Sequence, residues 1–519
     1  MILIPSSQYL RAEIQNEIGM LPPSLSFLKN QRLYEFQLKL VKKFWDKEKI
    51  LITLPEKFIL EKLDHDQINN LGADIKFCLS EVSLGKHIAN IIEENNPQTL
   101  KILHGDTLFL ELPTEDDIVV VGKPHETADW DVIKIGNSEL VWAGFFSFSD
   151  PKFFLKELKA NEYSFDKAIY SYGHIKKLKY IENRHWYDFG HLEELHRARE
   201  KFTTERVFNN LQINKYEVKK ISKKRSKIFN EYNWFQKMPS HLQKFLPNVY
   251  NFVDTKDEAQ YSMSYISGFS LSELMLFSNL SETKWNNILR ELLTFIQLQE
   301  TEIPKNSMQL SKEYMALIDK KNNSRVEDMI GSEFISANED LIMDGYSLGS
   351  IYDIISELSD IIKKQDCIPA FCHGDLCFSN LIYLSRGNII KLIDPRGVDS
   401  QLDSVIGDKR YDLAKLAHSL IWGYDRILFG DITFKRSGNE FKETTKIMKN
   451  KNQEVLKKIS TKLGLNKILL REDIVAITSL LFISMIPLHA DSLNRQESLF
   501  GNGLKIFQEI KEGKYKRNV

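Results

Sequence analysis

The sequence has few of the residues that interrupt a packed fold. Its 519 residues include 24 glycines and 14 prolines, roughly 7% against a usual ~12%, which excludes a collagen-like, elastic or largely disordered chain. It has only four cysteines, too few for the disulfide framework of a small secreted domain. We therefore expect a protein of a reducing, intracellular compartment, the cytoplasm.

Neither an excess of charge nor a long apolar run is present. The 70 Lys and Arg residues nearly balance the 71 Asp and Glu residues, so no field of one sign indicates a nucleic acid or an anionic membrane as partner. The longest apolar run, Ile474 to Leu488, is interrupted by polar residues and is shorter than the ~20 residues that cross a bilayer. It predicts a buried helix, and we expect no integral membrane segment.

The length predicts two or more domains, because it is about three or four times the commonest domain size. Up to about residue 200, strand-like runs alternate with helix-like runs, which predicts a mostly parallel sheet with helices on both faces. The predicted elements are a strand at Ile50–Leu54, a helix at Gly85–Glu94, strands at Ile118–Val121 and Leu140–Phe148, and a charged helix from Glu193.

Beyond residue 200 the pattern changes. A strand-rich stretch, Val207 to Ile221, is followed by a long helical region after about residue 270. We therefore predict one domain over residues 1–200 and a second over 201–519. The second would consist of a small lobe of about 201–268 and a large lobe of about 269–519.

The strongest functional signal is a loop between two apolar strands in the second part. Residues 371–383 read FCHGDLCFSNLIY and residues 391–397 read KLIDPRG. Phosphoryl transfer from ATP needs a carboxylate that accepts the hydroxyl proton, and an Asn and an Asp that hold Mg²⁺ against the phosphates. Asp375 is therefore the predicted catalytic base, and Asn380 and Asp394 are the predicted metal ligands.

This loop has His-Gly-Asp where protein kinases have His-Arg-Asp, and no Ala-Pro-Glu element follows it. In this it resembles the aminoglycoside phosphotransferase and choline kinase family, which phosphorylates small molecules. The resemblance implies an α+β protein-kinase-like domain, in which a strand Lys holds the ATP phosphates and a helix Glu orients it. The candidates are Glu231 and either Lys220 or Lys219. An extended strand turns only one of two neighbouring side chains inward, and we favour Lys220.

Other elements of this half are less specific. Gln260–Tyr265 is the predicted hinge strand beside the adenine, and Arg410–Leu416 resembles the family's helix after the metal loop, where Asp412 has a structural rather than a catalytic role. Trp422 and Tyr424 have two interpretations. They either line the acceptor pocket, where they would suit a cationic amino alcohol, or they belong to the core.

The first part contains two Asp residues next to apolar strands. Asp106 follows Gly105 after one strand, and Asp188 lies in the run WYDFGH of residues 186–191. Two such carboxylates can share a Mg²⁺ ion that bridges a sugar phosphate and the α-phosphate of an NTP. With Ala143-Gly144, these motifs resemble the sugar nucleotidyltransferase (pyrophosphorylase) family. The resemblance implies an α/β Rossmann-like nucleotidyltransferase domain with Asp106 and Asp188 as metal ligands.

The expected nucleotide end departs from that family's pattern. The family begins with LAAGxGxR, whereas this chain keeps Arg11 but has Ser7 and Tyr9 in place of the two glycines. A side chain at these positions hinders close approach of the backbone to a phosphate. The family's following Pro-Lys is also missing, because residues 22–24 read PPS. Arg11 and Ser7 are the remaining candidates for nucleotide binding, and either an active enzyme with an altered loop or a domain that only binds an activated product is compatible with the sequence.

Together the two resemblances predict a bifunctional enzyme. The kinase half would phosphorylate a small alcohol, amino alcohol or sugar with ATP and Mg²⁺, and the other half would join the product to an NMP from CTP or another NTP. This is similar to the kinase and cytidylyltransferase pair that supplies activated choline-type groups for bacterial surface polysaccharides, such as capsules. The alternative is a small-molecule kinase with a catalytically inactive nucleotidyltransferase-like binding domain.

Overall fold

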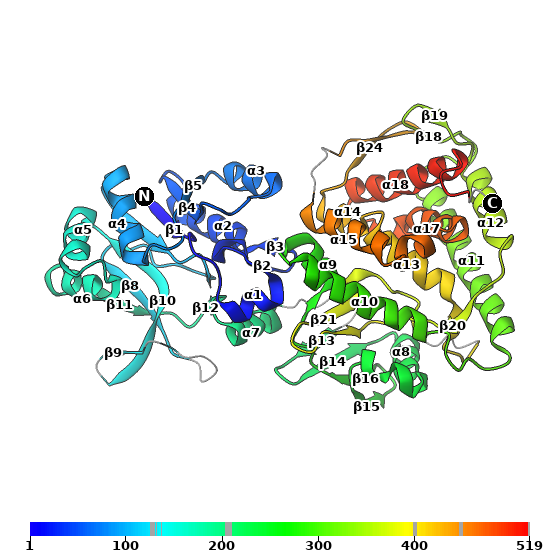
Figure 1. Ribbon diagram of the computed structural model, residues 1–519, viewed down its shortest axis with the longest axis horizontal. Helices are drawn as coiled ribbons and strands as arrows, with labels where there is room; N and C mark the ends of the chain where they lie inside the picture. Colours follow the sequence, from blue (N-terminus) through cyan, green and yellow to red (C-terminus); the bar gives the residue numbers. More distant parts are fainter. Residues whose placement is uncertain are drawn as a thin grey trace. The chain divides into compact units, whose positions relative to one another are not determined.

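The computed structural model describes residues 1–516 except 125–129, 131, 136, 203–209, 398–401 and 446–449. The chain divides into two compact units, shown in Figure 1. Unit 1 is Met1–Thr204 with Phe277–Asn279, and unit 2 is Glu205–Leu276 with Leu280–Val519. The predicted start of a strand-rich stretch at Val207 lies outside the described residues.

Unit 1 is built on a mixed sheet with the strand order β11-β8-β10-β6-β1-β4-β5, and β9 pairs with β10. These strands are β1 Ile2–Pro5, β4 Ile50–Pro55, β5 Asp74–Cys78, β6 Leu100–Leu103, β8 Ile118–Gly122, β9 Ile133–Ile135, β10 Ser138–Phe148 and β11 Lys179–Glu182. Two short pairs complete the unit, namely β2 Phe27–Leu28 with β3 Gln31–Arg32, and β7 Thr107–Phe109 with β12 Trp186–Asp188.

The main core of unit 1 lies between this sheet and helices that follow its strands. Buried side chains of β1, β6, β8 and β10 pack with those of α4 Leu84–Asn95, α5 Pro151–Ala160 and α6 Phe165–Lys176. Phe148 stacks on Phe154 with ring centroids 3.9 Å apart. The remaining helices are α1 Ala12–Ile18, α2 Leu33–Trp45, α3 Lys62–Asn70 and α7 Leu192–Phe202.

The prediction of a mostly parallel sheet holds only in part. Parallel pairing joins β1 to β4 and β6, β4 to β5, and β8 to β11. In contrast, β10 runs antiparallel to both β6 and β8. An apolar run such as Leu140–Phe148 indicates a strand buried on both faces, but burial is the same for either chain direction. The sequence pattern therefore could not give the direction of β10.

Unit 2 begins with an antiparallel sheet of order β13-β14-β16-β15, against which α8 packs. The strands are β13 Asn210–Ile213, β14 Glu217–Ser222, β15 Val249–Asp254 and β16 Ala259–Ser264, and α8 is Arg225–Lys237. Trp234 of α8 donates a hydrogen bond from Nε1 to the carbonyl oxygen of Cys372 at 2.7 Å. This bond connects the small sheet and its helix to the strand that precedes Asp375.

The rest of unit 2 is mainly helical. Its α-helices are α9 Leu271–Phe277, α10 Glu282–Leu298, α11 Ser307–Gly331, α12 Ile351–Lys363, α13 Lys409–Leu420, α14 Tyr424–Phe429, α15 Lys451–Lys462, α16 Leu465–Leu469, α17 Glu472–Ser484 and α18 Leu493–Lys511. Short strands run between them, namely β17 Phe269–Ser270, β18 Ile342–Met343, β19 Tyr346–Ser347, β20 Pro369–Phe371, β21 Leu381–Leu384, β22 Ile389–Leu392, β23 Ile406–Asp408, β24 Phe434–Ser437 and β25 Glu440–Glu443.

Two features of unit 2 differ from the sequence expectation. The predicted helix Ile474–Leu488 ends as α17 at Ser484, and residues 486–489 form a 3₁₀ turn that contains Pro487; proline has no backbone N–H to continue an α-helix. A small sheet of β18, β19, β24 and β25 interrupts the region predicted to be helical. Across the described ranges, no helix is both long enough and apolar enough to span a bilayer.

Candidate functional site

In unit 2, Asp375 lies in a loop that follows β20. Gly374 precedes it with a φ of +77°, a conformation that glycine adopts without strain. The Nδ2 group of Asn380 donates one hydrogen bond to the Asp375 carbonyl oxygen at 2.9 Å and one to its Oδ2 at 3.0 Å. These bonds fix the carboxylate relative to the predicted metal ligand Asn380.

Lys415 is a functional candidate that sequence reasoning missed. Its Nζ lies 3.0 Å from Oδ1 of Asp375. Burial on its own would raise the pKa of Asp375, but the Lys415 ammonium outweighs it and lowers that pKa to about 2. Asp375 is therefore ionised near neutral pH, as a proton acceptor must be. The available signal was position, since Lys415 follows Asp412 by one turn of the same helix, α13.

The predicted phosphate anchor forms a buried ion cluster. Lys220 Nζ lies 2.5 Å from Oε2 of Glu231 and 3.0 Å from Oδ1 of Asp394. Lys220 and Glu231 are almost fully buried, and the Tyr261 hydroxyl also donates to Glu231 at 3.2 Å. Burial disfavours the ammonium form, but Asp394 and Glu231 outweigh this effect and raise the pKa of Lys220. Lys220 is therefore a permanent cation beside Asp394.

Lys219 has a different position on the same strand. It is half-buried, whereas Lys220 is buried, as expected for neighbours on a strand whose side chains alternate between faces. The Lys219 side chain makes no hydrogen bond or ion pair within the part of the chain that the structure describes. Of the two lysines, Lys220 is the one placed beside Glu231 and Asp394.

Asn380 and Asp394 are brought together through the backbone. The amide of Ile393, the residue before Asp394, donates to the Asn380 carbonyl oxygen at 3.0 Å. The Nδ2 group of Asn380 donates to Asp375. The Oδ1 atom of the same amide carries lone pairs and can bind a cation. Mg²⁺ prefers oxygen ligands and takes only one or two from the protein when it also binds phosphates. The pair therefore fits Mg²⁺, although the described ranges contain no cluster of three or more His, Cys, Asp or Glu side chains suited to a metal.

Asp412 holds the backbone of the catalytic loop. It is fully buried, and its carboxylate accepts hydrogen bonds from the His373 amide at 2.8 Å, the Gly374 amide at 2.7 Å and Gln299 Nε2 at 2.8 Å. Burial raises the pKa of Asp412, and the charge of His373 opposes the rise. The residue touches no reacting group, so its role is to position the loop that carries Asp375.

We predict that Asp412→Ala destabilises unit 2 and impairs catalysis together. The change leaves buried donors without an acceptor, each costing about 1–3 kcal/mol, so the free energy of unfolding should fall by about 3 kcal/mol or more. Asp412→Asn keeps one acceptor oxygen and should lose less. Urea unfolding followed by tryptophan fluorescence measures the change, with the exposed Asp366→Ala as the matched control. Equal stability of the Asp412 and Asp366 variants would contradict the positioning role.

In unit 1, Asp106 and Asp188 lie close together at one end of the β7–β12 pair. A Cβ atom on Gly190 would stand 2.6 Å from Oδ2 of Asp106 and 3.2 Å from Oδ1 of Asp188, so a side chain at position 190 would require the Asp106 carboxylate to shift. Burial, and then the charge of Asp188, raises the pKa of Asp106. A buried carboxylate whose charged form is disfavoured by a neighbouring carboxylate fits a divalent cation, which would stabilise its charge.

His191 also belongs to this site, although it was not assigned from the sequence. Its Nδ1 lies 2.6 Å from Oδ2 of Asp188, and its backbone amide donates to the same oxygen at 3.1 Å. The hydrogen bond between the His191 ring and Asp188 raises the pKa of His191, whereas the charge of Arg11 lowers it. Arg11 thus acts on the end of unit 1 that carries the two carboxylates.

Polar groups of the loop after β1 are hydrogen-bonded to other segments of unit 1. Oγ of Ser6 accepts hydrogen bonds from the amide of Ser24 at 2.9 Å and from its hydroxyl at 2.8 Å. The Ser6 amide donates to Thr53 Oγ1 at 3.2 Å, Ser7 is buried and Arg11 is exposed. The two segments that depart from the family's nucleotide-binding pattern therefore bind each other.

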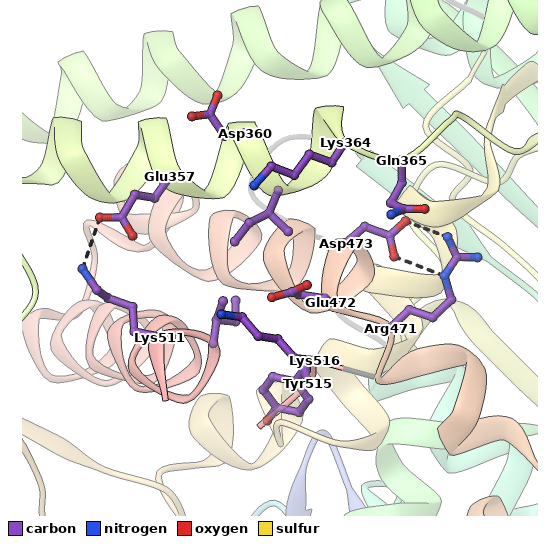
Figure 2. A pocket seen from close by; sticks show the side chains of 12 residues that line it. Glu357, Asp360, Lys364, Gln365, Arg471, Glu472, Asp473, Lys511, Tyr515 and Lys516 are labelled. Carbon is purple, nitrogen blue, oxygen red and sulfur yellow. Dashed lines mark hydrogen bonds and ion pairs between the residues drawn. The ribbon is translucent and has the colours of Figure 1, made fainter. Parts of the chain in front are cut away.

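A cavity of about 670 Å³ in unit 2 lies elsewhere, between α12, the start of α17 and the end of α18. Figure 2 shows that its charged side chains include both signs, with Lys511 paired to Glu357 and Arg471 paired to Asp473. None of the residues discussed above lines it. The cavity therefore contains none of the residues predicted to carry out phosphoryl transfer.

The two aromatic candidates for an acceptor pocket, Trp422 and Tyr424, have different neighbours. The Tyr424 ring stacks on His418 with centroids 4.0 Å apart, and its charge environment includes Lys415 and Asp375. Trp422 instead lies against Tyr515, with ring centroids 6.4 Å apart. Tyr424 is therefore placed near the predicted catalytic base.

Comparison with known proteins gives likenesses at the level of structure. No family model and no curated protein matches the sequence. A nucleoside-diphosphate-sugar pyrophosphorylase from Vibrio cholerae RC9 is similar at 14% identity and a TM-score of 0.32, over 38% of this chain and 99% of its own. The aminoglycoside phosphotransferase APH(4)-Ia is similar at 8% identity and a TM-score of 0.35, over 59% of this chain and 92% of its own. An aminoglycoside-3'-phosphotransferase of type VIII is similar at 12% identity and a TM-score of 0.30, over 60% of this chain and 99% of its own.

Proposed function

We propose that the chain is a bifunctional enzyme. Unit 2 transfers the γ-phosphoryl group of MgATP to the hydroxyl of a small molecule, and unit 1 joins the resulting phosphate to an NMP with release of pyrophosphate. The product of the first reaction is a substrate of the second, so their presence in one chain raises the effective concentration of the intermediate. Such an enzyme would supply activated groups for a bacterial surface polysaccharide and would work in the cytoplasm.

The observation that carries this proposal is the ion cluster of Lys220 with Glu231 and Asp394, together with Asn380 bonded to Asp375. In phosphoryl transfer the protein supplies position and charge rather than covalent chemistry. Lys220 would hold the α- and β-phosphates, and Asn380 and Asp394 would hold Mg²⁺. The ion would neutralise charge on the phosphates. Asp375 would accept the proton of the attacking hydroxyl.

In unit 1, Asp106 and Asp188 would hold the cation that brings a phosphate of the substrate to the α-phosphate of the NTP. Arg11 would contribute a cation at the same end. The oxygen of the substrate phosphate would attack the α-phosphorus, and pyrophosphate would leave. CTP is the first nucleotide to test, followed by the other NTPs.

The contacts of the β1 loop favour an alternative for unit 1. The amide and side chain of Ser6 are already bonded to Thr53 and Ser24, whereas a phosphate-binding loop leaves its amides for the ligand. Under this alternative, unit 2 is a small-molecule kinase and unit 1 only binds an activated or phosphorylated molecule.

An acceptor screen with the full chain tests the proposal. The mixture contains ATP, CTP and Mg²⁺ with one candidate acceptor at a time, and ADP and pyrophosphate are measured separately. Formation of both products with one acceptor is the expected result. ADP alone, after all four NTPs have been tried, would establish the kinase-only alternative. No ADP with any acceptor, together with no binding of a non-hydrolysable ATP analogue, would overturn both.

We predict that Asp106→Asn separates the two activities. It removes a charge from the carboxylate pair of unit 1, so pyrophosphate release should fall by about 10²-fold or more, the scale seen when a group that stabilises transition-state charge is removed. ADP formation by unit 2 should stay within about twofold. Asp116→Asn, a change at a half-exposed Asp of the same unit, is the control. Equal loss of ADP and pyrophosphate in Asp106→Asn would contradict two separate sites.

A further inference from the structure

Four cationic side chains interact with the predicted catalytic base. They are Lys415 of α13, Arg396 after β22, and Lys321 and Arg325 of α11. Each interacts electrostatically with Asp375. Four positive charges therefore share this one carboxylate as a common partner.

Contacts place the relevant face of α11 against the catalytic loop. Tyr314, two turns before Lys321, lies edge-on to Tyr411 with ring centroids 5.9 Å apart. Its hydroxyl stands 3.2 Å from the position of a Cβ atom on Gly374. Lys321 and Arg325 are four residues apart and so share a helix face. The Tyr314 Oη atom is buried and has no hydrogen-bond partner within the described part of the chain.

Arg396 is fixed at the same place. Its backbone amide donates to the His373 carbonyl oxygen at 3.0 Å, and its guanidinium donates to Tyr411 Oη at 3.0 Å. A Cβ atom on Gly374 would stand only 2.6 Å from Cβ of Arg396. The Arg396 side chain therefore begins directly beside the loop that carries Asp375.

The side chains of Lys321 and Arg325 are not paired directly with an acidic side chain. Neither side chain has an ion pair or hydrogen bond among the residues for which the structure gives positions. Partial desolvation, and then the charges of Arg396, Arg325 and Lys415, lower the pKa of Lys321 to about 8. Desolvation likewise lowers the pKa of Arg325, and Arg396 lowers it further. Crowded cations of this kind would be stabilised by a bound anion.

We propose that the acceptor of the kinase reaction is an anionic alcohol, one that already carries a phosphate or carboxylate group, bound by Lys321, Arg325 and Arg396. The inference rests on the proposed function and names the substrate class of the same site. ATP does not account for these positive charges, because Lys220 and a Mg²⁺ ion held by other elements of unit 2 would bind its phosphates. A cationic amino alcohol would be repelled, contrary to the interpretation suggested by Trp422 and Tyr424 in the sequence.

The reaction then balances as an ordinary phosphoryl transfer. The hydroxyl oxygen of the anionic acceptor forms a bond to the γ-phosphorus of ATP, and its proton passes to Asp375. The bond from the γ-phosphorus to the bridging oxygen breaks, and ADP leaves with that electron pair. The product carries a new phosphate group in addition to its original anion.

Binding to the full chain with Mg²⁺ and the non-hydrolysable analogue AMP-PNP tests this inference. By calorimetry at constant ionic strength, sn-glycerol 3-phosphate and D-glycerate are compared with glycerol and choline. At least one of the two anions should bind about 10-fold or more tightly than the neutral and cationic probes, the scale of one charge-assisted hydrogen bond. The phosphate and carboxylate arms distinguish the two possible anions.

The double variant Lys321→Ala/Arg325→Ala should weaken binding of the anion by about 10-fold or more and raise the KM of an anionic acceptor without changing the KM of ATP. Lys320→Ala is the matched control and should change neither, because Lys320 is exposed like Lys321 but lies about 100° away around α11. Tighter binding of choline, no binding of either anion to the nucleotide-loaded protein, or an effect on the KM of ATP alone would overturn the inference. Failure of AMP-PNP itself to bind would instead overturn the proposed function.

Discussion

Asp375→Asn should lower the rate of phosphoryl transfer by about 10²–10⁴-fold, the usual contribution of a general base. The amide keeps the size of the side chain but cannot take the hydroxyl proton. It also leaves Lys415 beside a neutral group, because the ion pair at 3.0 Å is lost. Affinity for MgATP should change little, since Lys220 and Asp394 remain. ADP release with the acceptor found in the screen measures the rate, and equilibrium binding of AMP-PNP measures the affinity.

Asp366→Asn is the matched control for this variant. Asp366 is an exposed residue before β20, so its amide variant should keep both the rate and the affinity. If Asp375→Asn retained the full rate, Asp375 would not be the base. If it lost AMP-PNP binding as well, its role would be structural, and the thermal midpoint of unit 2 would be expected to fall with it.

The strands and helices with long apolar runs were predictable, because such runs mark buried elements. The predicted strand Ile50–Leu54 lies within β4, and the predicted helix Gly85–Glu94 lies within α4. Two kinds of feature were not predictable. The direction of β10 depends on its neighbours rather than on its own residues, and the short strands β18 and β25 pair across about a hundred residues, without an alternating pattern long enough to detect.

The site was predictable where its residues are close in sequence. Asp375 and Asn380 belong to one loop, and their spacing alone indicated that they would meet. The sequence required only that one of Lys219 and Lys220 faces inward. The structure shows that Lys220 is the buried one. Lys321 and Arg325 were not predictable, because a charged residue on a helix looks the same whether it faces solvent or a substrate. For Lys415 the only signal was its spacing of one turn from Asp412.

The buried position of Lys220 leads to the second large effect. Lys220→Ala should lower the rate of phosphoryl transfer by about 10²–10³-fold, as when one charge-stabilising donor is removed from an active site. Lys219→Ala, one residue earlier on β14, should have an effect of about twofold or less, the surface-mutation scale. The contrast arises because only Lys220 lies within 3.0 Å of Asp394 and Glu231. Initial rates of ADP release at varied ATP concentration measure both variants.

A structural cause must be separated from loss of the phosphate anchor. Removing Lys220 leaves the buried Glu231 beside Tyr261 with Lys227, at 3.7 Å, as its remaining cationic neighbour. Breaking a buried ion pair costs about 3–5 kcal/mol, so the variant could lose activity by unfolding. The double variant Lys220→Met/Glu231→Gln removes both charges and should regain stability without regaining the rate. Recovery of the rate would show that Lys220 only balances Glu231. Persistent loss in a folded protein, with a raised KM for ATP, is the outcome that a phosphate anchor requires.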